Sequence, residues 1–279
     1  MIHTSRQLKA LVRNISKGDS AKAQIIIRNY VMERFLERLS LSQYRSNLIL
    51  KGGTLVAAMV GLDNRSTMDI DATIKNLPLN EESARKVVEE IIAIHIDDGM
   101  TFEIKSVSPI IDEADYPGIR LSLDAVLENM LTPLKIDFSS GDMITPREIA
   151  YSFRLLFEER IISIFAYNLE TVLAEKIETL LARGTVNTRM RDFYDIYILT
   201  TTQAQNIDND TLKAAFINTS KKRGSFALLS DVDIILNEIT ESTVLIDLWQ
   251  SYQRKFDYAN DILWKDVMES VKQLFYIVK

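Results

Sequence analysis

The stretch KGGTLVAAMVGLDNRSTMDID, residues 51–71, brings a glycine pair, a short apolar segment and two aspartates together in close succession. The apolar run before the glycines predicts a buried strand, and the apolar segment after them predicts a short helix. Residues 68–74 alternate in polarity, which predicts a strand with Asp69 and Asp71 on one face, roughly 7 Å apart at the backbone. Two neighbouring carboxylates repel each other unless a positive group lies between them. The pattern therefore raises the question of a metal ion.

The aspartate pair has two interpretations. Carboxylates at this spacing are the hard oxygen ligands that Mg²⁺ prefers, whereas an isolated Asp-x-Asp also fits a solvated strand face. Asp137, in the predicted strand PLKIDF at residues 133–138, shares a face with Lys135 and would supply a third carboxylate. That strand can also simply expose its polar side to water. If the two strands aim their carboxylates at each other, Asp69, Asp71 and Asp137 form a metal site.

Gly52, Gly53 and Thr54 lie where the short helix is expected to begin. The N–H groups at a helix N-terminus converge on anions, and the helix dipole favours negative charge there, so this turn is a candidate phosphate-binding element. Alone the turn is weak evidence; with the aspartates downstream it pairs a phosphate site with a metal site. Arg65, in the loop before the aspartates, is placed to contact a nucleotide or its acceptor.

A second cluster lies in the later part of the chain. In the predicted helix 169–182, Lys176 falls within the apolar stripe, where a cation needs a partner or a stem that reaches water. Asp192 and Asp195 are three residues apart on the next predicted helix and share a face. The alternative interpretation is two antiparallel helices joined by surface salt bridges.

The order of the predicted elements indicates an α/β fold with a mixed sheet, followed by a mainly helical region. We place a domain of residues 1–160 before a helical domain of residues 161–279. The expected strands are 47–50, 68–74, 102–107, 118–126 and 133–138. The expected helices are 4–16, 20–40, 54–60, 81–94, 169–182, 188–201, 211–218, 232–238, 244–258 and 261–275.

The composition is that of a globular protein, with 47% hydrophobic and 26% charged residues among 279. The absence of cysteine excludes disulfides and thiolate metal sites, and two histidines are too few for a multi-histidine zinc centre. No apolar stretch reaches the roughly 18 residues of a membrane span, and the N-terminus lacks the apolar core of a signal peptide. We therefore expect a cytoplasmic protein. Its net charge of −6 argues against nonspecific DNA binding.

The motifs resemble a known family. A glycine pair, a short helix and Asp-x-Asp on the next strand are similar to the signature of the DNA polymerase β-like nucleotidyltransferase superfamily. The fuller form at residues 51–71 looks like that of the AbiEii toxins, the nucleotidyltransferases of type IV toxin–antitoxin and abortive-infection systems. The segment TVLAEKIETLLARGTVNTRMRDFYDIYIL, residues 171–199, resembles the later motifs of that family. The glycine pair departs from the glycine-serine of many superfamily members, and Thr54 would then provide the hydroxyl.

The resemblance implies a nucleotidyltransferase-like N-terminal α/β domain, in an antiviral-defence toxin that uses Mg²⁺ or Mn²⁺ and a nucleoside triphosphate. It implies transfer of a nucleotide to an RNA acceptor, the 3′ end of tRNA, which blocks translation. Lys176 would be a triphosphate ligand, and Asp192 its catalytic or positioning partner; Asp195 could share that role. The active site would then lie in the cleft between the two domains. The resemblance further implies a cognate antitoxin that forms no stable complex, and we expect a monomer.

Two other functions use the same residues. A regulatory module would hold GTP or another triphosphate without transferring it, and Asp137 would then be dispensable. A metal-dependent phosphohydrolase would release phosphate without any acceptor. Incubation with Mg²⁺, a triphosphate and RNA separates the three, because only a transferase labels the RNA.

Overall fold

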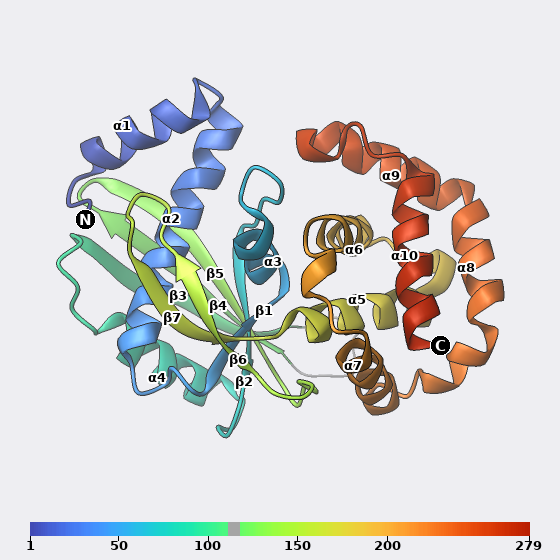
Figure 1. Ribbon diagram of the computed structural model, residues 1–279. Coiled ribbons are helices and arrows are strands. Elements are labelled where there is room, and N and C mark those ends of the chain that lie inside the picture. Colours follow the sequence, from blue (N-terminus) through green and yellow to red (C-terminus); the bar gives the residue numbers. More distant parts are fainter. Residues whose placement is uncertain (111–117) are drawn as a thin grey trace. The chain divides into compact units, whose positions relative to one another are not determined.

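The computed structural model describes residues 1–110 and 118–279, and the chain forms two compact units (Figure 1). The units are not continuous in sequence, since two short segments of the second unit lie within the sequence span of the first. The first unit comprises Met1–Leu62, Ser66–Asp142 and Ile149–Ala166. The second comprises Asp63–Arg65, Met143–Glu148 and Tyr167–Lys279.

The first unit is built on a mixed sheet with the strand order β3-β4-β5-β2-β1-β7-β6 in the described part of the chain. The pairs β2–β5 and β1–β7 are parallel, and the other neighbours are antiparallel. The strands are β1 (Leu48–Lys51), β2 (Asp69–Ile74), β3 (Met100–Ile110), β4 (Gly118–Leu127), β5 (Met130–Ser140), β6 (Ile149–Arg154) and β7 (Ile161–Ala166). The helices of this unit are α1 (Ser5–Ser16), α2 (Ser20–Leu41), α3 (Gly52–Val60) and α4 (Glu81–Ile92).

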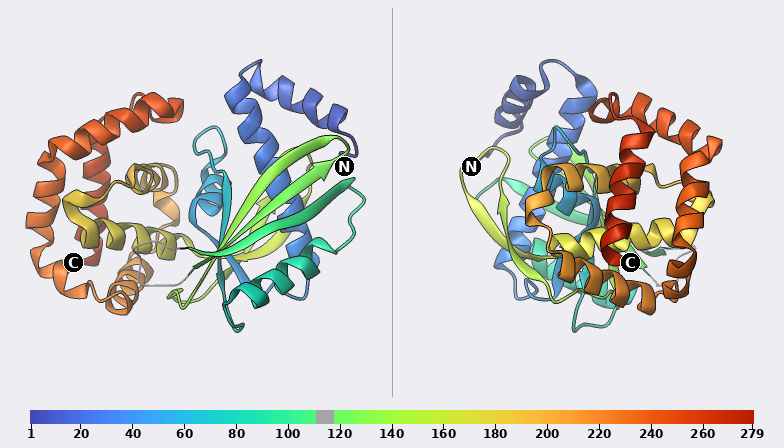
Figure 2. Two further views of the ribbon diagram at one scale, coloured as in Figure 1. Left: turned by 180° about the vertical axis from the view of Figure 1, so that it is seen from behind. Right: turned by 45° about the vertical axis from the view of Figure 1, so that its right-hand side comes forward.

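Strand β5 has one apolar and one polar face. On β5, Leu134, Ile136 and Phe138 are buried, whereas Lys135 and Asp137 belong to the other face. Helix α2 packs on β5 and β7, and α4, which also contacts α2, packs on β3 and β4 (Figure 2). These two helices cover the apolar face, which leaves the other face available for the polar side chains of β2 and β5.

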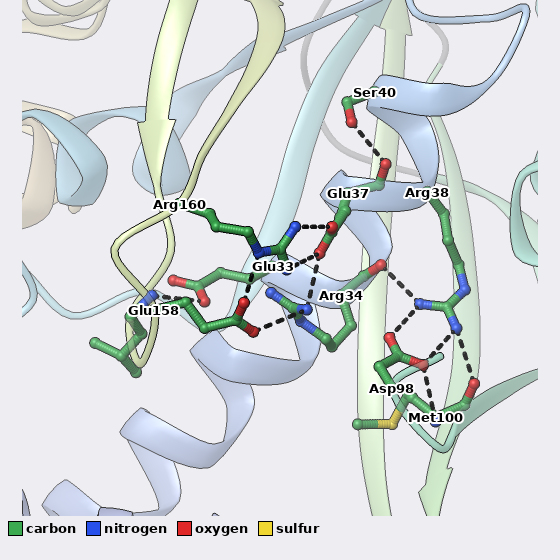
Figure 3. Close-up of polar contacts among 10 residues, drawn as sticks. Glu33, Arg34, Glu37, Arg38, Ser40, Asp98, Met100, Glu158 and Arg160 are labelled. Carbon is green, nitrogen blue, oxygen red and sulfur yellow. Dashed lines mark hydrogen bonds and ion pairs between the residues drawn. The ribbon is translucent and has the colours of Figure 1, made fainter. Parts of the chain in front are cut away.

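Several charged side chains of α2 are buried where this helix contacts the turn before β3 and the β6–β7 turn (Figure 3). The guanidinium of Arg38 forms two hydrogen bonds, of 2.8 and 2.9 Å, with the carboxylate of Asp98 in the turn before β3. Arg34, which is fully buried, lies 2.8 Å from Glu37 and 3.6 Å from Glu158 in the β6–β7 turn. Because a buried charge is costly without a partner, these pairs specify where the two turns meet α2.

Glu33 on α2 is a buried carboxyl group with an unusual protonation state. Its Oε2 accepts a hydrogen bond of 2.9 Å from the N–H of Leu156. Burial raises the pKa of Glu33 to about 8, although this hydrogen bond and the nearby Arg34 act in the opposite direction. The carboxylates of Glu37 and Glu158 add to the increase. The folded protein therefore retains a proton that an unfolded chain releases at lower pH.

This difference predicts a pH-dependent stability. The folded pKa of Glu33 lies above its ordinary value of 4.5, so its contribution is complete below about pH 4.5 and is lost as the pH rises towards about 8. The variant Glu33→Gln cannot ionise, and its free energy of unfolding relative to wild type should rise across that window by about 1 kcal/mol or more. Urea unfolding at pH 5 and pH 8.5 measures the difference. Glu82→Gln, on an exposed position of α4, is the matched control; a pH-independent difference for Glu33→Gln would contradict the interpretation.

The second unit is helical. Its helices are α5 (Leu169–Arg183), α6 (Met190–Thr202), α7 (Asn209–Lys222), α8 (Val232–Glu241), α9 (Thr243–Lys255) and α10 (Trp264–Val278). Helix α5 begins with Asn168 as its N-cap, whose side chain accepts a hydrogen bond from the N–H of Thr171. Helix α5 packs against α6 and α7, and α10 covers the same two helices. Among the described residues, no helix combines the length and the apolar character that crossing a membrane requires.

The predicted fold class is confirmed: a mixed sheet with helices precedes a helical region. The predicted elements differ from those observed by a few residues at their ends, but β6 and β7 were not predicted. Strand β6 is exposed along most of its length, so its sequence lacks the alternation of a half-buried strand. Strand β7 alternates, and its parallel pairing with β1 is a long-range contact that local sequence does not reveal.

Candidate active site

The polar face of the first unit carries a row of four charged residues on four adjacent strands. Asp71 of β2 lies opposite Asp137 of β5 in the parallel pair. Lys51 of β1 pairs in register with Asp71, and Arg120 of β4 pairs in register with Asp137. Since paired residues share a face, the row runs cation, carboxylate, carboxylate, cation. Asp69 lies two residues before Asp71 on the same face.

The first turn of α3 lies directly against the side chain of Asp71. The N–H of Gly53 donates a hydrogen bond of 3.2 Å to Oδ2 of Asp71. Gly52 has a positive φ of 62°, and a Cβ at that position would overlap Oδ2 of Asp71 and lie 2.7 Å from its Cγ. Glycine is therefore required at position 52 for both backbone conformation and space. The hydroxyl of Thr54 donates 2.5 Å to the carbonyl oxygen of Asp69, which ties the helix to β2.

Two of the four residues in the row, Lys51 and Arg120, were not identified as site residues from the sequence. Nε and Nη2 of Arg120 donate to the two oxygens of Asp137, at 2.8 and 2.6 Å. The ammonium of Lys51 lies 2.6 Å from Oδ2 of Asp142, which also accepts from the hydroxyls of Thr73 and Ser139. Lys51 directly precedes the glycine pair, but only strand register reveals that it and Arg120 flank the carboxylates.

The electrostatics of Asp71 indicate that the nearby positive groups do not fully compensate its negative charge. Burial raises the pKa of Asp71 to about 6, and the adjacent carboxylates of Asp137 and Asp69 contribute to this increase. Lys51 and the N–H of Gly53 act in the opposite direction without cancelling it. A cation beside Asp71 would relieve this repulsion.

Asp69, Asp71 and Asp137 fit a divalent cation in their chemistry, because carboxylate oxygens are the ligands that Mg²⁺ and Mn²⁺ prefer. In the described part of the chain, no three acidic or histidine side chains already converge closely enough to hold a metal ion. Both oxygens of Asp137 are bonded to Arg120 instead. A cation bound at all three carboxylates would therefore have to share Asp137 with Arg120 or displace that arginine.

The close approach of Gly52 to Asp71 gives a prediction. Gly52→Ala should displace the Asp71 carboxylate and weaken Mn²⁺ binding by about tenfold or more, as expected when a ligand is misplaced. Gly61→Ala is the matched control: Gly61 also has a positive φ, of 89°, but a Cβ there meets no atom within 4 Å. Both variants should lose about 1 kcal/mol of stability from backbone strain. Titration with Mn²⁺, followed by electron paramagnetic resonance, measures the affinity; equal affinities of the two variants would refute the assigned role of Gly52.

The second unit contains the other predicted site residues, and the structure joins four of them in one ion-pair network. The ammonium of Lys176 lies 2.9 Å from Oδ1 of Asp192 and 2.7 Å from Oδ2 of Asp195. Asp195 also accepts from Nε and Nη2 of Arg65, at 2.6 and 3.2 Å. The hydroxyl of Tyr194 donates to the carbonyl oxygen of Asn64, so two contacts hold the segment around Arg65 against α6.

Within this network Asp195 is the central residue. Burial alone would raise the pKa of Asp195, but Arg65 and Lys176 outweigh that effect and lower it. Burial opposes the charge of Lys176, yet Asp192 and Asp195 raise its pKa above the ordinary value. Arg65, Lys176 and Asp195 are therefore charged at neutral pH. The alternative of exposed salt bridges does not describe this network, because Lys176, Asp195 and Arg65 are buried.

Removal of the cation tests the structural part of this network. Lys176→Met keeps an aliphatic side chain of similar length but removes the cation that contacts Asp192 and Asp195. Breaking a buried ion pair in this way costs roughly 3 kcal/mol of stability. The free energy of unfolding, measured with urea, should fall by about that amount. Lys213→Met, at an exposed position of α7, should leave it nearly unchanged. Equal stabilities for the two variants would contradict the buried network.

The chain is similar to a known family and to known structures. The family model described as "Nucleotidyl transferase AbiEii toxin, Type IV TA system" matches residues 34–273. A crystal structure of JHP933 from Helicobacter pylori has a TM-score of 0.51 and 16% identity, covering 91% of this chain and 93% of that one. A second crystal structure from H. pylori has a TM-score of 0.49 and 15% identity, covering 91% of this chain and 96% of that one. No curated protein is similar enough in sequence to count as a match.

The first structure, at this low identity, shows a shared fold and nothing more. The family model spans both motif clusters, from the carboxylates on β2 and β5 to Lys176 and Asp195. The chain belongs to the AbiEii family of nucleotidyltransferase toxins of type IV toxin–antitoxin systems.

Proposed function

We propose that this chain is a metal-dependent nucleotidyltransferase that joins a nucleotide, taken from a nucleoside triphosphate, to the 3′ end of an RNA. The observation that supports this proposal most strongly is the row on the polar face of the sheet. Asp71 and Asp137 lie opposite each other on parallel strands, Asp69 is on the same face, and the N-terminus of α3 is hydrogen-bonded to Asp71. Carboxylates for a cation and N–H groups for phosphate thus come from adjacent elements.

In this proposal, Asp69, Asp71 and Asp137 hold Mg²⁺ or Mn²⁺. When bound, the cation offsets the negative charge of the carboxylates and polarises the α-phosphate. The N-terminus of α3 at Gly52 and Gly53 binds phosphate oxygens, for which the N–H of Gly53 gives up its hydrogen bond to Asp71. The hydroxyl of Thr54 keeps the first turn of α3 fixed to β2. The carboxylates therefore supply charge, the glycines supply contacts to phosphate, and Thr54 fixes the position of the helix.

The transfer itself is an in-line substitution. The hydroxyl oxygen of the acceptor forms a bond to the α-phosphorus, and the bond from that phosphorus to the oxygen shared with the β-phosphate breaks. Asp137 accepts the proton of the hydroxyl, and pyrophosphate leaves with the electron pair of the broken bond. The partial exposure of the Asp137 side chain, at 18%, supports this role. A general base must be within reach of the hydroxyl that it deprotonates.

Membership of the family is the support for the acceptor and the biological setting that we propose. We propose the 3′ end of tRNA as the acceptor, so that transfer blocks translation and growth. A cognate antitoxin would counteract this chain without forming a stable complex, and we expect the chain to act as a monomer in the cytoplasm. Lys176 remains our predicted ligand of the triphosphate, with Asp192 and Asp195 orienting its ammonium at 2.9 and 2.7 Å.

The proposal is tested by transfer of label to RNA. Each of the four α-³²P-labelled nucleoside triphosphates is incubated with the protein, Mg²⁺ and total tRNA, and labelled RNA is resolved on a gel. Asp69→Asn should reduce labelling at least about 100-fold, because a metal ligand is lost. Asp97→Asn is the matched control, since the Asp97 side chain is 93% exposed. Chelation of the metal should also abolish labelling by the wild-type protein.

The competing functions give other products. Bound triphosphate without labelled RNA would indicate a regulatory module, and released phosphate without labelled RNA would indicate a phosphohydrolase. Wild-type labelling by Asp69→Asn, with its fold confirmed by circular dichroism, would contradict the assigned reaction centre.

A further inference from the structure

Arg120 is the one residue of the charged row that combines a tight contact with access to solvent. Its two hydrogen bonds to Asp137 engage both carboxylate oxygens. Its side chain is nevertheless 41% exposed, whereas that of Lys51, at the other end of the row, is 15% exposed and is held by Asp142. Lys51 is thus held by Asp142 and is largely buried, whereas Arg120 is held by Asp137 and is partly exposed.

The charges around the Arg120–Asp137 ion pair argue against a purely structural role for it. A half-exposed pair on a sheet surface contributes little to stability. Here, however, the pair shares a face of the sheet with Asp71, which lies opposite Asp137 in the parallel β2–β5 register, and with Asp69, two residues before Asp71. Arg120 therefore offsets the charge of three carboxylates, and not of Asp137 alone.

A divalent cation at these carboxylates changes the balance. The divalent cation carries two positive charges and Arg120 carries one, and the two groups repel each other. A guanidinium displaced from Asp137 keeps its five N–H donors, in a planar fork that matches a phosphate group as well as a carboxylate. Its side chain on β4 is partly exposed, so that it could turn towards solvent and meet a phosphate group there.

We propose that Arg120 is a triphosphate-binding residue that holds Asp137 in the metal-free protein and exchanges this carboxylate for phosphate when the divalent cation binds. This inference rests on the proposed function, since it assumes a metal site at Asp69, Asp71 and Asp137. It gives the arginine two roles. In the metal-free state Arg120 competes with the cation, and in the loaded state it contributes to affinity for the substrate.

The two roles give effects of opposite sign when Arg120 is replaced. Arg120→Gln removes the competitor, so Mn²⁺ alone should bind about threefold tighter or better. The same variant loses a charge-assisted contact to phosphate, so inorganic tripolyphosphate, added with saturating Mg²⁺, should bind at least about tenfold more weakly. Arg120→Lys keeps the charge without the fork, and both affinities should lie between those of the wild type and of Arg120→Gln.

The experiment is isothermal titration of the full chain with Mn²⁺ alone and with tripolyphosphate in Mg²⁺. Arg154→Gln is the matched control, because Arg154 is an exposed arginine on β6, at the edge of the same sheet. It should leave both affinities unchanged. Thermal unfolding confirms that every variant is folded under the conditions of the titration.

Opposite shifts for Arg120→Gln support the exchange. Shifts of the same sign, an unchanged affinity for either probe, or failure of the wild type to bind Mn²⁺ would overturn it. These results are independent of RNA labelling. Opposite shifts without any labelled RNA would retain Arg120 as a ligand and reject nucleotidyl transfer, whereas labelled RNA without opposite shifts would retain the transfer and reject the exchange.

Discussion

Asp71 and Asp137 face each other across two parallel strands, and partial removal from water makes their repulsion stronger than it would be at an open surface. Arg120 and Lys51 offset this repulsion from the two sides of the pair. Lys51 is in turn held by Asp142. Burial would raise the pKa of Asp142, but Lys51 and two hydroxyl groups outweigh that effect and lower this pKa to about 2. Lys51 and Arg120 do not fully compensate the carboxylates, so a cation beside Asp71 would relieve the remaining repulsion.

The opposite face of the sheet keeps this row in place. The apolar side chains of β5 pack under α2, and the buried ion pairs of α2 connect that helix to the turn before β3 and to the β6–β7 turn (Figure 3). Such pairs contribute less to net stability than to the choice of one arrangement, since a misplaced turn would leave a charge such as Arg38 unpaired. The packing of α2 on the apolar face thus helps to fix the register of the strands that carry the carboxylates.

Much of this arrangement was predictable, and the remainder depended on long-range contacts. The alternation around Asp69 and Asp71 predicts a strand, and the glycine pair predicts a turn, because both signals are local. The partner of Asp137 is not local: Arg120 precedes it by 17 residues, and only the antiparallel β4–β5 register brings the two together. For Lys176, burial in an apolar stripe predicts a need for partners, but the sequence gives no sign that Arg65 completes the network.

The central claim is that Asp69, Asp71 and Asp137 form the metal-dependent reaction centre. Anomalous X-ray diffraction from crystals soaked in Mn²⁺ tests it most directly, because the anomalous signal locates the ion without reference to any assumed mechanism. The account predicts a Mn²⁺ peak within about 2.5 Å of carboxylate oxygens of both Asp69 and Asp71, with Asp137 drawn towards the ion. Mn²⁺ bound only elsewhere on the chain, with the Asp137–Arg120 pair intact at saturating Mn²⁺, would contradict it.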